Sequence, residues 1–373
     1  MRFDVSSTAL LSRLQSISKV IASKNSLPMD SFLFNLEGNT LTVTASDAET
    51  RLVTSVDVMN AQGAGLFAVS AKILLDPLKE LPEQPLTFDI NDENLEIFIH
   101  FQNGKYNFIG QKGDTYPQQK PLNDNAISIS MDAQMLLNGI SRSLFATADD
   151  ELRPVMNGVY FDIHTDDLTF VASDGHKLVR LRNLAVKSPE RASFILPKKP
   201  ANLLKNLLAK ESEQVLIKFD DNNAYITCTN FEMVCRLIEG RYPNYNSVIP
   251  QENPFKVTID RISFLNALKR VSVFSNPASS LVKLHLKDSL ITVSAQDIDF
   301  STSAEERIVC QFDGTELSIG FKATYLIEIL GNISSEEVVL ELADPSRAGL
   351  IVPSENDEDE DLLMLLMPMM LND

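Results

Sequence analysis

Ala172-Ser173-Asp174-Gly175-His176-Lys177-Leu178 follows the apolar run Leu168-Thr169-Phe170-Val171, and together they have the pattern of a strand that enters a tight turn. Two other parts of the chain have nearly the same pattern. Thr40 to Asp47 lies about 127 residues earlier, and Ser289 to Asp297 lies about 123 residues later. Self-similarity at such a fixed period indicates three copies of one domain.

Each copy is expected to contain two helices and about eight strands. The first copy begins with a short strand at residues 2–5, and apolar residues then recur at helical spacing from Leu10 to Ile21. This unit recurs in the other copies, and each copy has a second strand and helix. The predicted helices span residues 7–24, 71–81, 131–147, 197–211, 260–275 and 322–330. The sequence therefore predicts an α+β fold with tandem domains at residues 1–125, 126–253 and 254–373.

The composition is typical of packed globular domains, since 44% of the 373 residues are hydrophobic. No run of 18 apolar residues is present, and we do not expect the residues from Met1 onward to form a signal peptide. Cys228, Cys235 and Cys310 share no metal-like spacing, so we expect reduced thiols. A soluble, cytoplasmic protein without a metal, a cofactor or a membrane partner is predicted.

Charge is divided by structural element. The whole chain has a net charge of -18, yet the predicted helices carry 14 basic and 6 acidic residues, a net charge of +8. If all the helices faced one surface, that surface would attract a phosphate backbone, while the remainder would repel it. Few aromatic residues lie among these charges, so such contacts would be independent of base sequence. The alternative is that amphipathic helices simply carry solvated lysines.

Motifs for catalysis are few. There is no phosphate-binding loop and no zinc-protease histidine pair. Asp174 and His176 resemble a catalytic Asp-His arrangement, but no nucleophile or second base with a matching signature accompanies them. Asp174-Gly175 is more simply a tight turn, and Asp47 and Asp297 occupy the same place in the other copies without the Gly-His. The middle copy is therefore specialised at this turn.

Four segments together resemble one family, the bacterial DNA polymerase III beta subunits, which are replicative sliding clamps. They are Leu152 to Val159, Val171 to Leu178, Leu237 to Tyr245 with Val248 to Pro250, and Met367 to Met369. With the threefold repeat, the resemblance covers essentially the whole chain. It implies a head-to-tail homodimer in which six domains form a ring, with helices lining a hole that encircles double-stranded DNA. It also implies a non-enzymatic processivity factor located at the nucleoid.

The resemblance also implies three sets of functional residues. A partner-peptide pocket between the second and third domains would contain Met156, Ser173, Gly175, His176, Lys177, Leu178, Pro243, Val248, Tyr325, Leu365, Met367, Pro368 and Met369. The dimer interface would involve Tyr106, Asn107 and Phe108 on one edge and Val273, Phe274 and Ser275 on the other. Residues expected to face DNA are Lys24, Lys72, Arg142, Lys198, Lys199, Lys205, Lys269 and Arg270.

Some positions depart from the family pattern. Lys177 and Ser247 stand where many relatives carry arginine, and Lys322 stands where many carry asparagine. Residues Glu355 to Asp361 are acidic except for Asn356, and we expect either a solvated loop between the last two strands or an interaction tail. A further hypothesis is that this acidic stretch lies beside the peptide pocket and tunes which peptides bind there.

The sequence thus favours a DNA sliding clamp that tethers the replicative polymerase, the clamp loader and other replication and repair proteins through short peptides. Two alternatives remain open at this stage. One is a polyanion-processing enzyme centred on Asp174 and His176. The other is a protein-binding repeat scaffold that does not bind DNA.

Overall fold

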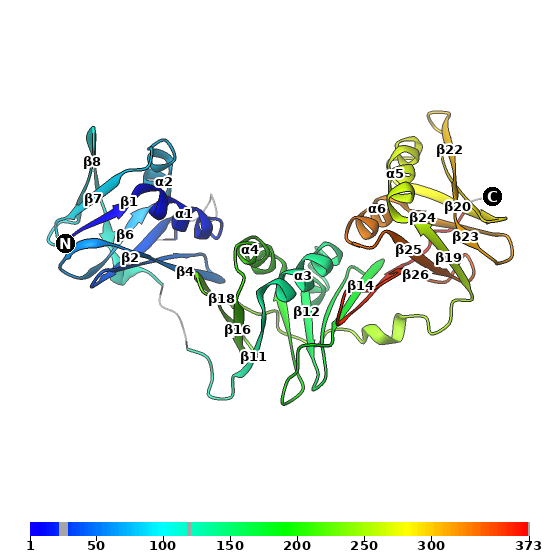
Figure 1. Cartoon of the computed structure of the whole chain (residues 1–373), viewed down its shortest axis with the longest axis horizontal. Coiled ribbons are helices and arrows are strands. Elements are labelled where there is room, and N and C mark those ends of the chain that lie inside the picture. The colour runs from blue at the N-terminus through cyan, green and yellow to red at the C-terminus, as the bar shows by residue number, and fades with distance from the viewer. Residues whose placement is uncertain (22–28, 118–120, 372–373) are drawn as a thin grey trace. The chain divides into compact units, whose positions relative to one another are not determined.

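A computed structural model of the chain describes residues 1–21, 29–117 and 121–371 (Figure 1). The chain forms two compact units. Unit 1 comprises residues 1–137 and 202–237, and unit 2 comprises residues 138–201 and 238–373. Lys24, one of the residues expected to face DNA, lies outside the described residues.

The predicted helices are present, and all except the last are shorter than expected. They are α1 (Ser7–Ser18), α2 (Ala71–Lys79), α3 (Ala133–Ser143), α4 (Lys198–Leu208), α5 (Arg261–Val271) and α6 (Ala323–Gly331). The predictions for α3 and α5 ran too far because each helix ends in a 3₁₀ turn, at Leu144–Ala146 and at Ser272–Phe274. The start of α5 is fixed by Asp260, whose Oδ1 accepts a hydrogen bond from the Ser263 N–H at 2.7 Å.

Unit 1 contains two antiparallel sheets among its described residues. The first has five strands in the order β5 (Met59–Gln62), β1 (Arg2–Ser6), β7 (Pro85–Ile90), β8 (Glu96–Phe101) and β9 (Gly104–Ile109). The second has nine strands in the order β10 (Gln111–Lys112), β6 (Gly65–Ser70), β2 (Ser31–Glu37), β3 (Thr40–Ser46), β4 (Thr50–Asp57), β18 (Phe231–Arg236), β17 (Asn223–Thr227), β16 (Gln214–Phe219) and β11 (Ile127–Asp132). The β4–β18 pairing joins the first and middle copies.

Unit 2 has the corresponding arrangement. Its nine-stranded sheet has the order β15 (Ala192–Pro197), β12 (Gly158–Ile163), β13 (Leu168–Ser173), β14 (Lys177–Asn183), β27 (Glu360–Leu366), β26 (Gly349–Pro353), β25 (Glu337–Leu342), β19 (Phe255–Asp260) and β23 (Gln311–Phe312). The four-stranded sheet has the order β22 (Thr302–Val309), β21 (Leu290–Asp297), β20 (Leu281–Lys287) and β24 (Leu317–Lys322). The β14–β27 pairing joins the middle and last copies, and residues 362–366 complete a sheet.

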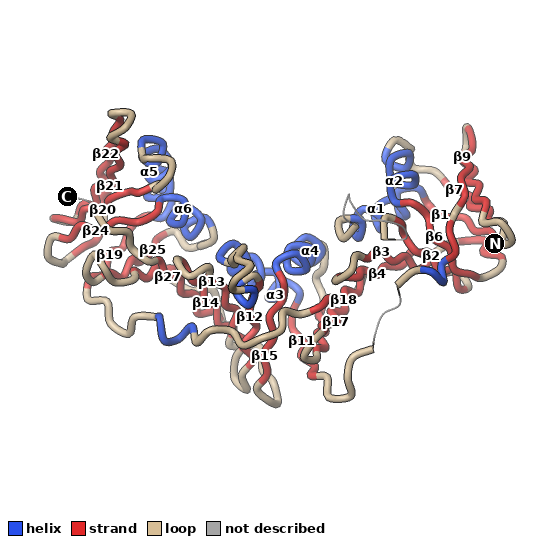
Figure 2. Tube along the Cα trace, turned by 180° about the vertical axis from the view of Figure 1, so that it is seen from behind, coloured by secondary structure: helices blue, strands red, loops and turns tan. Residues whose placement is uncertain are grey.

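In both units helices pack against the sheets (Figure 2). In unit 1, Leu10, Leu14 and Ile17 of α1 are fully buried, because their spacing places them on one helix face. In unit 2, α5 packs against β21 and β22, and α6 packs against β24 and β27. Burial of each such leucine stabilises the fold by about 1.5–3 kcal/mol.

The division of charge persists with the observed helix ends. The six α-helices of the described chain carry ten basic and two acidic residues, a net charge of +8, which leaves -26 for the rest of the chain. The shortened helices lose acidic and basic end residues in equal number. None of the helices in the described ranges is long and apolar enough to span a membrane.

Candidate functional site

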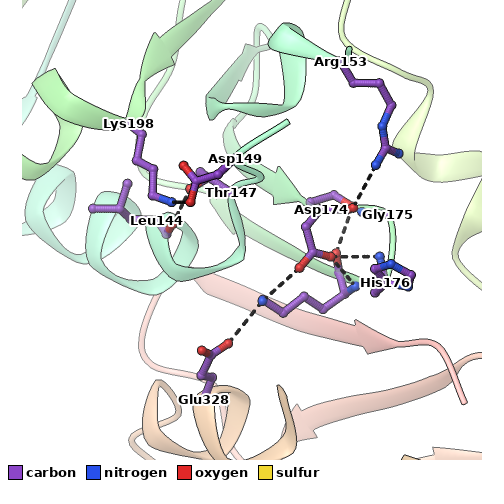
Figure 3. A network of polar contacts seen from close by, with 11 residues as sticks. Leu144, Thr147, Asp149, Arg153, Asp174, Gly175, His176, Lys198 and Glu328 are labelled. Carbon is purple, nitrogen blue, oxygen red and sulfur yellow. Dashed lines mark hydrogen bonds and ion pairs between the residues drawn. The ribbon is translucent and has the colours of Figure 1, made fainter. Parts of the chain in front are cut away.

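The turn between β13 and β14 is organised by Asp174. Its Oδ1 accepts hydrogen bonds from the backbone N–H groups of His176, at 2.8 Å, and Lys177, at 2.9 Å. Gly175 has a φ of +90°, a region that side chains with a Cβ rarely adopt. The side chain of His176 stacks on the Tyr325 ring, with centroids 6.3 Å apart. Asp174 therefore builds the turn, and its carboxylate holds the backbone of His176 instead of the imidazole (Figure 3).

The same aspartate turn occurs in the other two copies. Asp47 Oδ1 accepts from the N–H groups of Glu49, at 2.8 Å, and Thr50, at 2.6 Å. Asp297 Oδ1 accepts from the N–H group two residues later, at 2.9 Å. The prediction that this aspartate belongs to the repeated architecture is therefore confirmed, because a carboxylate that accepts backbone N–H bonds is a turn-forming group.

Lys177 connects the middle copy to the last one. Its side chain is only 6% exposed, and its Nζ lies 3.0 Å from Asp174 Oδ2 and 3.1 Å from Glu328 Oε2, on α6. The same ammonium lies 4.0 Å from the centre of the Tyr325 ring, and Lys322 Nζ lies 4.8 Å from that ring. We call Asp174, Lys177, Tyr325 and Glu328 the lysine cluster.

Electrostatics in the lysine cluster favour the charged forms. Burial of Asp174 works to raise its pKa, but the N–H groups of Lys177 and His176 and the Lys177 ammonium hold it below its ordinary value. Burial of Lys177 works to lower its pKa, but Asp174 and Glu328 raise it above its ordinary value. The Lys177 charge is thus used within the protein, and it is not available to pair with a ligand.

The site rests on an apolar cluster that both copies supply. Its buried residues are Val171, Leu178, Ile195, Tyr242, Tyr245, Ile249, Ala348, Leu350 and Leu365. Leu178 and Leu365 are opposite each other in the β14–β27 pairing, and the rings of Tyr160 and Tyr242 stack 4.6 Å apart. The middle and last copies are therefore packed into one continuous core beneath the site.

The C-terminal residues cross this site. The Met367 N–H donates to His176 O at 2.8 Å, and the Met369 N–H donates to Gly320 O at 2.8 Å. A Cβ at Gly320 would come within 2.7 Å of Met369 O, so only glycine allows this approach. The chain end thus joins the turn before β14 to β24, and Met367 is 43% exposed.

The structure separates the expected peptide-site residues into floor and surface. Met156, Ser173, Lys177, Leu178 and Leu365 are buried. The exposed or partly exposed members are Gly175, His176, Pro243, Val248, Tyr325, Met367, Pro368 and Met369. Sequence analysis did not predict Glu328, because its partner Lys177 lies far away along the chain and only the tertiary fold brings the two together.

The acidic stretch, residues Glu355–Asp361, is not beside the peptide-site residues. In the β14–β27 pairing, Glu360 is opposite Asn183, whereas Leu366 is opposite Lys177. At about 3.3 Å per residue, these ends of the pairing are roughly 20 Å apart. The hypothesis that the stretch tunes peptide binding by lying beside the site is therefore wrong. It does connect the last two long strands, β26 and β27, as expected.

The residues expected at a dimer interface lie at or near the free edges of sheets. Tyr106, Asn107 and Phe108 belong to β9, the edge strand of the five-stranded sheet in unit 1, and the next residue, Ile109, is 78% exposed. In unit 2, Val273, Phe274 and Ser275 lie in and after the 3₁₀ turn that follows α5. That turn packs against the edge strand β22, and Val273 is 78% exposed.

The residues expected to face DNA fall into two groups. Lys72, Lys199, Lys205 and Lys269 are exposed. Three others have carboxylate partners, because Lys198 pairs with Asp149 at 2.5 Å, Arg270 pairs with Glu306 at 2.6 Å, and Arg142 pairs with Asp357 and Glu360 at 2.5 and 2.6 Å. Sequence analysis did not predict these pairs.

Comparison with known families is decisive for the whole chain. Profiles of the N-terminal, central and C-terminal domains of the DNA polymerase III beta subunit match residues 1–120, 130–244 and 246–370. The chain belongs to the DNA polymerase III beta subunit family. The predicted three-copy α+β fold is confirmed.

Individual members of the beta subunit family are similar over their full length. The beta sliding clamp of Pseudomonas aeruginosa is 28% identical, and that of Haemophilus influenzae is 27% identical, with 100% of both chains covered in each case. A crystal structure of the Pseudomonas aeruginosa sliding clamp bound to griselimycin has a TM-score of 0.94 at 27% identity, and one from Bartonella birtlesii has 0.92 at 26%. Both cover 100% of each chain. The two alternatives, a polyanion-processing enzyme and a scaffold that does not bind DNA, have no support among beta subunit relatives.

Proposed function

We propose that this chain is a DNA sliding clamp, a processivity factor that has no catalytic activity of its own. Two protomers assemble head to tail into a ring of six domains that encircles double-stranded DNA. The observation that carries this proposal is the match of all three domain profiles to a chain whose helices are basic while the remainder is acidic. Enclosure of DNA needs only weak attraction between helices and phosphates, and a net charge of +8 on the helices suits that task.

The ring is built from domains at residues 1–125, 126–253 and 254–373, each with two α-helices. The ring closes through contacts between the first domain of one protomer and the third domain of the other, since a head-to-tail contact joins two different surfaces. The residues at this contact are Tyr106, Asn107, Phe108, Val273, Phe274 and Ser275. The free edge strands β9 and β22, with exposed Ile109 and Val273 nearby, support this assignment.

Partner proteins bind through short peptides at the site that includes His176, Tyr325 and Met367. These partners are the replicative polymerase, the clamp loader and other replication and repair proteins. Exposed methionine and valine side chains above a buried apolar cluster suit peptides of varied sequence, because methionine adapts its shape to its contacts. The lysine cluster fixes the backbone beneath this surface.

Contact with DNA is made by exposed helix cations, namely Lys72, Lys199, Lys205 and Lys269. Lys24 belongs to the same expected set. These contacts are to phosphates and carry no base specificity, so the clamp slides, and we propose that it acts at the nucleoid in the cytoplasm.

The test is retention on circular DNA. The protein, loaded onto a nicked circle by a clamp loader, should stay bound through gel filtration and be released when the circle is cut. Retention that survives linearisation would refute topological enclosure. His176→Ala should keep retention and weaken binding of partner peptides, whereas loss of a catalytic turnover in that variant would favour an enzyme.

A further inference from the structure

The acidic segment, Glu355–Asp361, is an ordered part of unit 2. The Leu184 N–H, just after β14, donates to Asp359 O at 2.8 Å. Asn356 Oδ1 accepts from the Leu362 N–H at 2.9 Å. Asp361 pairs with Arg180 at 2.9 Å, which anchors the end of the segment. Residues 355–359 are exposed, and the segment is held against the protein by these defined contacts.

The main target of the segment is Arg142, in the last turn of α3. Arg142 Nη2 lies 2.5 Å from Asp357 Oδ2, and Nη1 lies 2.6 Å from Glu360 Oε2. Ser334 Oγ also accepts from Nη2, at 3.1 Å. The Arg142 side chain is only 14% exposed. Two oxygens on two neighbouring guanidinium nitrogens reproduce the paired contact that arginine makes with a phosphate group.

This arrangement sets Arg142 apart from other helix cations. Lys72, Lys205 and Lys269 are exposed, and the described part of the chain gives them no carboxylate partner. Arg270 does have one, Glu306, but its side chain remains 61% exposed. Arg142 is both more buried and held by two acids, so one basic group of the helices is withdrawn from solvent by the acidic segment.

The contact of two carboxylates with the single Arg142 guanidinium leaves an excess of negative charge. Burial raises the pKa of Glu360, Arg142 lowers it, and the nearby Asp357 raises it, with the net shift upward. Asp361 is in the reverse situation, because it lies between two bases, Arg180 at 2.9 Å and Arg182 at 3.6 Å. The excess negative charge around Arg142 instead resembles a phosphodiester backbone, which presents successive anionic oxygens to a guanidinium.

We propose that Asp357 and Glu360 are an intramolecular competitor for DNA phosphate, which occupies Arg142 and is displaced when the clamp binds the backbone closely. This inference rests on the proposed clamp function, and it adds an autoinhibitory contact that weakens DNA binding by one phosphate contact. Displacement is a movement of the Asp357 and Glu360 side chains, because the backbone at Glu360 is held in the β14–β27 pairing opposite Asn183.

The test compares salt dependence of DNA affinity in full-length protein. Asp357→Asn/Glu360→Gln should free Arg142, and a single added phosphate contact steepens the plot of log affinity against log salt by about 0.9. If affinities are equal at 1 M salt, this corresponds to roughly eightfold tighter binding to a linear duplex at 0.1 M salt. Glu355→Gln/Glu358→Gln is the matched control, because it removes two charges from the same segment without touching Arg142. Equal slopes in the two double variants would overturn the proposal.

A second comparison begins in the natural chain, and this first half does not depend on the folding of the double variant. In the natural chain, Arg142→Ala should lower DNA affinity much less than Lys205→Ala does, because Arg142 is already occupied. In the Asp357→Asn/Glu360→Gln background, the two alanine substitutions should lower DNA affinity by the same factor. If Arg142→Ala and Lys205→Ala lowered DNA affinity equally in the natural chain, the proposal would be overturned, since Arg142 would then already contact phosphate. Failure of the natural protein to stay on circular DNA would refute the clamp function itself, and this proposal with it.

Discussion

Replacing Lys177 by methionine removes the ammonium group at the centre of the lysine cluster and keeps the length of the side chain. Breaking a buried ion pair by removing one partner costs about 3–5 kcal/mol. Here Asp174 retains two backbone N–H donors and the Glu328 side chain is 46% exposed, which reduces the cost. We therefore expect a loss of about 2–3 kcal/mol in unfolding free energy, including about 0.5–1 kcal/mol from the lost cation–π contact.

Urea unfolding is the assay, because urea leaves ion pairs unscreened. The transition to follow is the one that reports on unit 2, and Lys322→Met is the matched control. Lys322 Nζ also lies over the Tyr325 ring, at 4.8 Å, but it has no carboxylate partner among the residues that the structure describes. Its loss should cost less than about 1 kcal/mol. If both variants lost the same stability, the carboxylates would not be responsible and the reasoning would fail.

The pH dependence of this difference follows from the two pKa shifts. The Asp174 pKa lies below its ordinary 3.8, so its contribution is present above that pH and is lost as pH falls through the lowered value. The Lys177 pKa lies above its ordinary 10.5, so its contribution is present below that pH and is lost as pH rises through the raised value. The stability difference between natural protein and Lys177→Met should therefore be constant near neutral pH and shrink only at the two extremes. A change near neutrality would contradict the assigned partners.

Further predictions concern the turn and the sheet edge. Gly175→Ala forces a φ of +90° on a residue with a Cβ, which would lie 2.9 Å from Arg153 Nη1, so we expect a loss of about 1–2 kcal/mol in urea and weaker partner-peptide binding. Unchanged stability would show that the turn relaxes at no cost. Ile109→Asp, at an exposed edge position, should convert dimer to monomer in size measurements and leave the folded domains intact. A variant that stays dimeric would place the subunit contact elsewhere.

Part of the site was predictable because local patterns determine it. The repeated strand and aspartate at Asp47, Asp174 and Asp297 indicated three copies, and the structure gives all three the same turn. The turn is local, since the carboxylate binds backbone N–H groups two and three residues away. The positive charge of the helices was also readable, because helical periodicity places the basic residues even when the helix ends are uncertain by several positions.

The contacts between copies were decided only by the tertiary structure. Sequence analysis placed Glu355–Asp361 beside the peptide site, but the pairing of β14 with β27 places Glu360 at the opposite end, next to Arg142. Likewise, Lys177 meets Glu328 only because α6 packs beside β27. A sequence specifies which residues are charged and which segments form strands, whereas the partner of each charge depends on strand register between distant segments. Register is set by the packing of the whole core. The repeat and its turns therefore follow from the sequence alone, whereas the ion pairs depend on the tertiary structure.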